Sequence, residues 1–203
     1  MGGSGKTTAV DTLYRMTKDD GKDMVPVSPL TKISMKSGAT LYFDRGVFQS
    51  QKHDQVKYHI YTVAGQKQFS PLRHKVFQGT DGVIFMIDSQ VHEFEENIEA
   101  LLELKRESRG NLIKEIPLVV MLNKQDLDNV IDKRDIKHIL KDEGLWYNTD
   151  DQLATWNPPI YKTCALYGKK KNIYRSFSDL ARRAYLYKTY GEGKAPLKKS
   201  VVE

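Results

Sequence analysis

The chain has 203 residues, of which 39% are hydrophobic and 29% charged, a balance typical of one soluble globular domain. No apolar run approaches the roughly 18 residues of a membrane helix, and the polar, glycine-rich N-terminus does not have the pattern of a signal peptide. The single cysteine, Cys164, excludes an internal disulfide, and we expect a cytoplasmic protein. The net charge of +6 is concentrated from Lys169 onward, where ten Lys and Arg face three Asp and Glu.

The chain opens with a glycine-rich stretch that precedes a helical pattern over residues 6–17. Backbone N–H groups of such a turn bind phosphate at a helix start, where Lys6 would reach the β- and γ-phosphates and Thr7 would ligate Mg²⁺. Gly5-Lys6-Thr7 matches the end of the phosphate-loop motif G-x-x-x-x-G-K-[ST], although the first glycine of that motif would fall before Met1. Taken alone, the stretch favours a phosphate loop only slightly over a flexible, unstructured terminus or a cloning scar. The candidate phosphate-binding residues are Gly2, Gly3, Ser4, Gly5, Lys6, Thr7 and Thr8.

Two strands are expected next, a short one over residues 40–44 and a second over 56–61, antiparallel to each other. The second leads into Thr62-Val63-Ala64-Gly65-Gln66. Gly65 could donate its backbone N–H to a γ-phosphate without steric obstruction, and Gln66 could orient the attacking water.

The remainder of the chain alternates strand and helix patterns. Strands are expected over 82–88, 117–123 and 160–165, and helices over 93–106, 132–143 and 172–190. The first two of these strands are almost wholly apolar, as expected of strands buried on both faces. The alternation predicts an α/β fold with a mostly parallel central sheet and helices on both faces. The domain is expected to end near residue 190 and to be followed by a flexible basic tail over 191–203.

The most specific motif is Asn123-Lys124-Gln125-Asp126, at the carboxyl end of a predicted buried strand, where ligands of open α/β sheets bind. The Asp126 carboxylate can accept two hydrogen bonds from the N1–H and 2-amino groups of guanine, which adenine lacks. A polar turn is the alternative for this motif alone, but its order and distance after Gly5-Lys6-Thr7 favour a nucleotide site. Cys164 and Ala165, at the end of the last predicted strand, could brace the base through backbone groups or simply be small residues that end a strand.

Together these motifs resemble the Ras-like small GTPases, most closely the MglA-type subfamily of bacteria and archaea, from Gly2 to about Tyr187. The resemblance implies a P-loop NTPase with a Ras-like G domain that binds GTP/GDP with Mg²⁺ and acts as a molecular switch with GTPase activity. It also implies roles for individual residues. Thr40 would hold Mg²⁺ and sense the γ-phosphate, Gly65 would contact the γ-phosphate, Gln66 would be catalytic with Lys6 and Thr40, and Asn123, Lys124 and Asp126 would bind guanine.

Three departures from the family pattern carry expectations. Thr62 stands where small GTPases usually have an Asp near the Mg²⁺, so we expect Asp44 to substitute through a bridging water. Ala39 stands where MglA-like proteins place an arginine, which predicts slow intrinsic hydrolysis stimulated by a partner, with Arg45 and Arg73 as internal substitutes. The strand that launches a phosphate loop is absent, and a mis-assigned start codon or a trimmed chain is our explanation.

The resemblance also implies a GTPase-activating partner, a small roadblock/longin-domain dimer, docking at residues 40–56. No lipid-attachment motif is visible, so membrane contact would be electrostatic, through Lys169–Lys171, Arg182, Arg183 and the tail. A non-hydrolysing guanine-nucleotide scaffold is the main alternative. Nucleic-acid binding through the basic C-terminal region is disfavoured because no stacking motif accompanies the charges, and a P-loop kinase is disfavoured because it would not need Asn123–Asp126.

Overall fold

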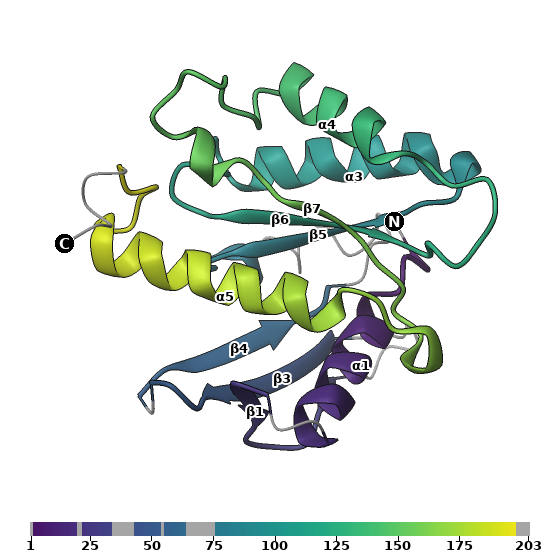
Figure 1. The fold of residues 1–203 in the computed structure, drawn as a ribbon, viewed down its shortest axis with the longest axis vertical. Coiled ribbons are helices and arrows are strands. Elements are labelled where there is room, and N and C mark those ends of the chain that lie inside the picture. Colours follow the sequence, from purple (N-terminus) through teal and green to yellow (C-terminus); the bar gives the residue numbers. More distant parts are fainter. Residues whose placement is uncertain (1, 20–21, 34–42, 54, 64–75, 198–203) are drawn as a thin grey trace.

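The structure, a computed structural model, describes residues 2–19, 22–33, 43–53, 55–63 and 76–197 (Figure 1). A parallel sheet with strand order β5-β6-β7 lies at its centre. The strands are β5 (Val83–Asp88), β6 (Leu118–Asn123) and β7 (Ile160–Lys162), and every residue of β6 is buried. The predicted strands are therefore confirmed. The last one ends three residues early, because Cys164 turns into an isolated bridge with Lys171.

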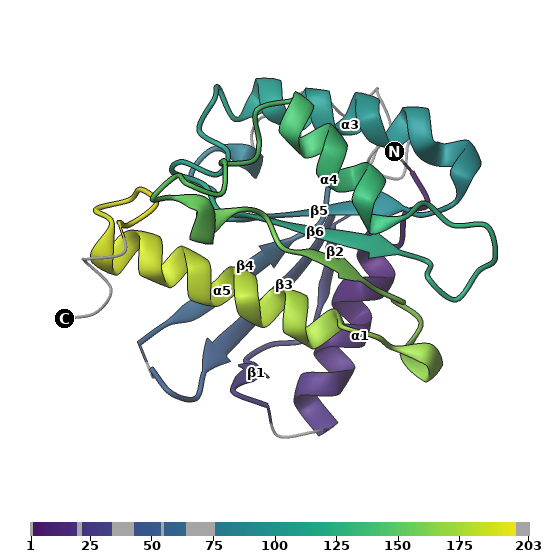
Figure 2. The same cartoon turned by 45° about the horizontal axis from the view of Figure 1, so that its top comes forward.

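Helices cover both faces of the parallel sheet, as predicted. Figures 1 and 2 show α3 (Phe94–Glu107) and α4 (Lys133–Asp142) on one face, and α1 (Lys6–Asp19) and α5 (Ile173–Tyr190) on the other. The four helices match the predicted ones to within a few residues. Short 3-10 turns are η2 (Val91–Glu93), η3 (Ala154–Trp156) and η4 (Tyr167–Lys169).

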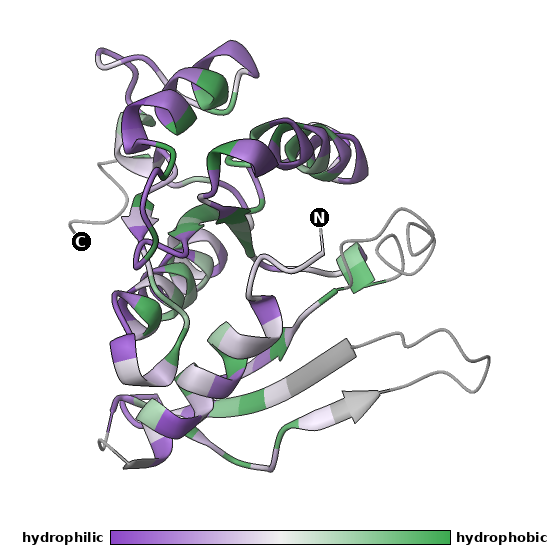
Figure 3. Cartoon of the chain, turned by 90° about the vertical axis from the view of Figure 1, so that its right-hand side faces the viewer, coloured by the Kyte–Doolittle hydropathy of each residue, from purple (hydrophilic) through white to green (hydrophobic). Residues whose placement is uncertain are grey.

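Strand alternation divides the interior into two cores. Phe85, Ile87, Val120 and Leu122 pack with Leu101 of α3 and with α4. The intervening side chains Met86 and Met121 point the other way and pack with α1, α5 and Phe48. Successive residues of a strand face opposite sides of the sheet, so a strand covered on both sides must be apolar throughout. Figure 3 shows the matching pattern on the helices, whose hydrophilic residues lie on their outer sides.

The remaining strands form a separate antiparallel sheet. It comprises β1 (Met24–Pro26), β2 (Thr31–Ile33), β3 (Phe43–Ser50) and β4 (Lys57–Tyr61), with β3 pairing with each of the others. The antiparallel pairing of β3 and β4 is confirmed, although β3 runs on to Ser50 and residues 40–42 lie outside the described part. Within the described residues no ladder joins β4 to β5. The α/β class is confirmed, and the antiparallel strands form a second sheet beside the parallel one.

The chain after α5 packs back onto the domain. The Ala195 N–H donates to the Lys114 carbonyl at 2.7 Å, and Trp156 Nε1 donates to the Pro196 carbonyl at 2.6 Å. The sequence predicts a flexible tail from Gly191, but contacts extend to Pro196 because the Trp156 indole lies against it. Residues 198–203 lie outside the described part.

Arg183 does not lie on the basic surface that the sequence predicts. Its side chain is buried, its Nη1 donates to the Trp156 carbonyl at 3.3 Å, and its Nε lies 3.4 Å from Asp179 Oδ1. It therefore belongs to the packing of α5 on the Trp156 segment and is not available to a membrane. Among the described residues, no helix is both long and apolar enough to cross a bilayer.

Candidate nucleotide-binding site

The glycine-rich segment forms a tight loop that leads directly into α1. Gly3 and Gly5 adopt left-handed backbone conformations with φ of 74° and 93°, which glycine alone adopts without cost. A Cβ on Gly5 would lie 2.5 Å from Asn123 Nδ2, whereas one on Gly3 would meet nothing within 4 Å. The requirement for glycine at position 5 is therefore imposed by a residue 118 positions further along the chain, counted from the sequence numbers.

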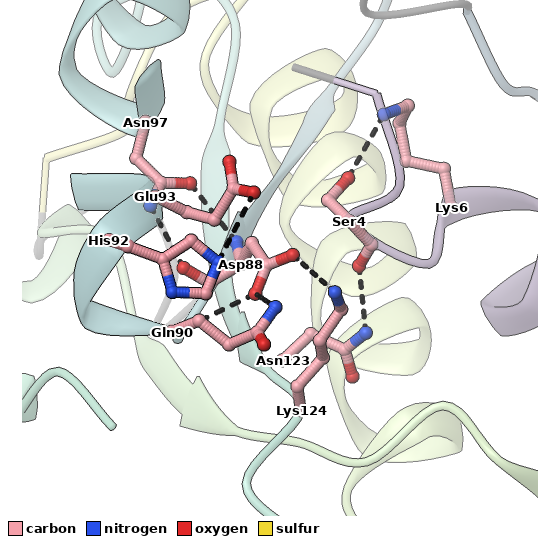
Figure 4. Close-up of polar contacts among 9 residues, drawn as sticks. All are labelled: Ser4, Lys6, Asp88, Gln90, His92, Glu93, Asn97, Asn123 and Lys124. Atoms are coloured by element: carbon pink, nitrogen blue, oxygen red, sulfur yellow. Dashed lines mark hydrogen bonds and ion pairs between the residues drawn. The ribbon is translucent and has the colours of Figure 1, made fainter. Parts of the chain in front are cut away.

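Asn123 joins the two motifs that the sequence singled out. Its Nδ2 donates to the Ser4 carbonyl at 2.8 Å (Figure 4). Its Oδ1 accepts from Thr163 Oγ1 at 3.3 Å. The side chain is almost completely buried, so both of its polar atoms need partners, and both have them. The candidate phosphate loop and the candidate guanine-binding motif are therefore joined directly by a hydrogen bond.

The helix end beside this loop presents the candidate phosphate ligands. Lys6 begins α1, and its Nζ donates to Ser4 Oγ at 3.0 Å. Thr7 is exposed in the first turn and Thr8 is half-buried. Helix N-termini carry free N–H groups and a partial positive charge, so a phosphate at this loop would meet N–H donors and the Lys6 ammonium.

Lys124 is held by a carboxylate that the sequence reasoning did not select. Its ammonium pairs with Asp88 Oδ2, and Asp88, the last residue of β5, is buried. The Gln90 N–H and Nε2 donate to Asp88 Oδ1 at 3.2 and 3.1 Å, and Asn97 bonds to the Asp88 backbone (Figure 4). The sequence does contain a signal for Asp88, because it is the polar residue that ends an apolar strand. The same pattern identified Asn123.

Asp126 lies between two side chains from the turn after β7. Its Oδ1 accepts from Cys164 Sγ at 3.4 Å, and its Oδ2 lies 3.5 Å from Lys169 Nζ. Burial alone would raise the pKa of Asp126, but the Cys164 thiol, a backbone N–H and the Lys169 ammonium together lower it. The carboxyl is therefore ionised at neutral pH and can accept two hydrogen bonds.

Cys164 acts through its side chain as well as its backbone position. Burial raises the pKa of its thiol, and the neighbouring Asp126 carboxylate raises it further, so the thiol stays protonated and remains a donor. The adjacent Ala165 carbonyl accepts from Thr12 Oγ1 of α1. This turn is therefore attached both to the helix that follows the glycine loop and to the carboxylate that would read the base.

The residues expected at the γ-phosphate and Mg²⁺ are only partly within the described chain. Thr40, Gly65 and Gln66 lie outside it, as do Ala39 and Arg73. The backbone of Asp44 pairs with Lys32 of β2, and that of Arg45 with Tyr61 of β4, while both side chains are outside the description. Thr62 is buried directly after β4. Among the described residues, no group of His, Cys, Asp or Glu is clustered as a metal site would require.

The described half of the site suits a purine nucleotide. It combines a glycine-rich loop at a helix start with an ionised carboxylate at the carboxyl edge of a parallel sheet, the position at which such sheets bind ligands. Thr7 is exposed in the first turn of α1, whereas the side chains of Thr40 and Asp44, the other Mg²⁺ ligands predicted from the sequence, lie outside the described part.

Comparison with known proteins agrees with this geometry. The family model described as "Arf: ADP-ribosylation factor family" matches residues 1–183. The chain is 30% identical to the Mutual gliding-motility protein MglA of Myxococcus xanthus (strain DK1622) over 148 residues, covering 70% of this chain and 72% of that protein. It is 27% identical to the human ADP-ribosylation factor-like protein 4A over 169 residues, covering 81% of this chain and 71% of that protein.

The family model spans nine-tenths of the chain. The alignment with each relative covers more than two thirds of this chain and more than two thirds of the relative. The predicted resemblance to Ras-like GTPases near MglA is therefore confirmed, and with it the prediction of a GTP-binding P-loop protein. The chain belongs to the ADP-ribosylation factor family of Ras-like small GTPases.

Proposed function

We propose that this chain is a cytoplasmic Mg²⁺-dependent switch that selects guanine nucleotides and hydrolyses GTP slowly until a partner stimulates it. The observation that carries the proposal is the ionised Asp126 carboxylate, fixed beside a loop whose conformation depends on Asn123. A purine that offers two adjacent donors satisfies that carboxylate, whereas adenine leaves it unpaired in a largely buried position.

The substitution Asp126→Asn tests this selection. An amide presents one acceptor and one donor, so it matches the N1–H and 2-carbonyl of xanthine and mismatches guanine. We expect GDP affinity to fall on the order of 100-fold, since the hydrogen bond from the 2-amino group is lost and the one from N1–H no longer goes to a charged acceptor, and XDP affinity to rise. Equilibrium binding of fluorescent GDP, XDP and ADP measures this, with Asp128→Asn in the exposed turn as the matched control. Equal affinity of the wild type for ADP and GDP would contradict the proposal.

The hydrolytic part of the proposal assigns the attacking water to Gln66, the γ-phosphate contacts to Lys6, Thr40 and Gly65, and Mg²⁺ to Thr7, Thr40 and Asp44. The support is the family resemblance together with the arrangement of Lys6 and Thr7 at the loop. With Ala39 in place of an arginine, we expect slow single-turnover loss of GTP from the purified chain, accelerated by a roadblock/longin-domain dimer that supplies or positions a cation. No turnover with or without such a partner would favour the non-hydrolysing scaffold.

The basic C-terminal region is the proposed site of any electrostatic membrane contact. Lys169–Lys171 and Arg182 are exposed, while Arg183 is buried and excluded from the surface. Anionic lipid attracts such clusters by about 1 kcal/mol per residue, so contact through these few cations would be weak and would weaken further with salt.

A further inference from the structure

We propose that Lys169 is a specificity-determining residue whose ammonium competes with the 2-amino group of guanine for an oxygen of the Asp126 carboxylate. The inference rests on the proposed guanine-nucleotide binding. It concerns a side chain to which the nucleotide-binding motifs give no role, because Lys169 lies outside Asn123–Asp126 and Thr163–Ala165.

The first observation is that each oxygen of the Asp126 carboxylate has a neighbouring donor. Oδ1 of Asp126 faces the Cys164 thiol, Oδ2 faces the Lys169 ammonium, and the Asp126 side chain is only 16% exposed. A base that approaches this carboxylate must bring two donors to its two oxygens. The ammonium covers part of Oδ2, so it competes with the second donor for that oxygen.

The second observation is the rigidity of the turn that carries Lys169. Cys164 and Lys171 exchange backbone hydrogen bonds of 3.3 and 3.1 Å, and the Lys169 N–H donates to the Leu166 carbonyl at 3.0 Å. The Tyr167 ring lies between the guanidinium of Arg15, 3.8 Å from the ring centroid, and the ammonium of Lys170, at 4.3 Å. The turn is therefore fastened to α1 and holds the Lys169 backbone beside Asp126.

The third observation is that the Lys169 side chain can leave. It is 65% exposed, its stem has four flexible carbons, and water can solvate its ammonium once it swings away. An exposed ion pair of this kind shifts an equilibrium by about 1.4- to 5-fold, so Lys169 adjusts affinity and does not block the site.

A nucleotide without the 2-amino group separates this role from others. Inosine offers N1–H and a 6-carbonyl but nothing at position 2, so IDP needs one carboxylate oxygen and lets Lys169 keep the other. GDP needs both oxygens. Lys169 therefore reduces the advantage of GDP over IDP, and removing its charge should increase that advantage.

The experiment compares equilibrium dissociation constants for GDP and IDP in the full chain and in three variants. Lys169→Met is expected to bind GDP about two- to five-fold more tightly and IDP within 1.5-fold of the wild type. Lys169→Arg keeps the charge, so the advantage of GDP over IDP in binding affinity should stay at the wild-type value or fall. Lys171→Met removes the same charge from an exposed position in the same turn and should leave the ratio unchanged. The gain in Lys169→Met should shrink as salt is raised, because salt screens the ion pair in the wild type.

Three outcomes would overturn the inference. Weaker GDP binding by Lys169→Met would mean that Lys169 supports the bound base. Equal changes for GDP and IDP would mean that it acts on the phosphates by general attraction. The same change in GDP affinity relative to IDP affinity in Lys171→Met would mean that the effect is not specific to Lys169. If the wild type bound neither GDP nor GTP, the proposed function itself would be wrong, which is a different result from a bound nucleotide whose ratio does not move.

Discussion

The two sheets of this protein differ in what holds them together. All six residues of β6 are buried between two layers of helices, whereas β4 alternates exposed and half-buried side chains. In the proposed function, base selection belongs to Asn123, the last residue of the fully buried strand β6, and to Asp126, three residues later. The residues expected to sense the γ-phosphate lie on either side of β3 and β4 in the sequence, with Thr40 before β3 and Gln66 after β4. On this proposal, nucleotide selection is built on the more deeply buried sheet, and γ-phosphate sensing on the sheet whose strand β4 has exposed side chains.

The strongest test of this difference is a pair of substitutions, one in each sheet. Leu122→Ala removes a completely buried side chain of β6 and should lower the free energy of unfolding by about 2–5 kcal/mol. Lys57→Ala, at an exposed position of β4, should change it by about 0.5 kcal/mol or less. Urea denaturation followed by circular dichroism measures both. Equal losses would show that the two sheets are equally dependent on burial.

A second pair tests whether the glycine loop depends on the end of the parallel sheet. Gly3→Ala places a side chain in a left-handed conformation with open space around it and should cost about 1–2 kcal/mol. Gly5→Ala adds a collision with Asn123, whose displacement would leave the buried Ser4 carbonyl unpaired at a further cost of about 1–3 kcal/mol. Denaturation midpoints in the absence of nucleotide measure the difference. Identical costs would mean that Asn123 does not hold the loop.

The smallest expected effect lies in the helical layer over the parallel sheet. Asp132 caps α4 by accepting from the Arg134 N–H, and the Asp132 N–H donates to the Asp135 carboxylate. The Arg134 backbone and guanidinium, and then Lys162, lower the pKa of the Asp132 carboxyl. A lowered native pKa stabilises the fold above the unfolded pKa of about 3.9 and loses that effect as pH falls below it.

Asp132→Ala should therefore lower the melting temperature slightly at pH 7, and the difference from the wild type should narrow as the pH is lowered below about 4. Thermal unfolding at pH 7 and at pH 3 measures this, with Asp128→Ala, in the exposed turn before the cap, as the control. A difference that grew on acidification would have the wrong sign for this cap.

Short-range patterns in the sequence were sufficient to predict much of this protein. The apolar runs at 82–88 and 117–123 identified the buried strands, because a strand covered on both faces needs no alternation. The helices were predicted within a few residues, and Gly5-Lys6-Thr7 with Asn123–Asp126 indicated the nucleotide and the family. The strand and helix signals need only neighbours along the chain, and the two motifs need only their order and spacing in the sequence.

Only the tertiary structure decided the contacts between distant segments. The three-residue strands β1 and β2 are too short to show a period and exist because β3 pairs with them. Pro196 docks on Trp156, Arg183 is buried beside it, and Lys169 reaches Asp126 across 43 positions of sequence. The physical reason is that a hydrogen bond or ion pair depends on where the whole chain path brings two side chains, and a sequence pattern specifies only what each side chain could do on arrival.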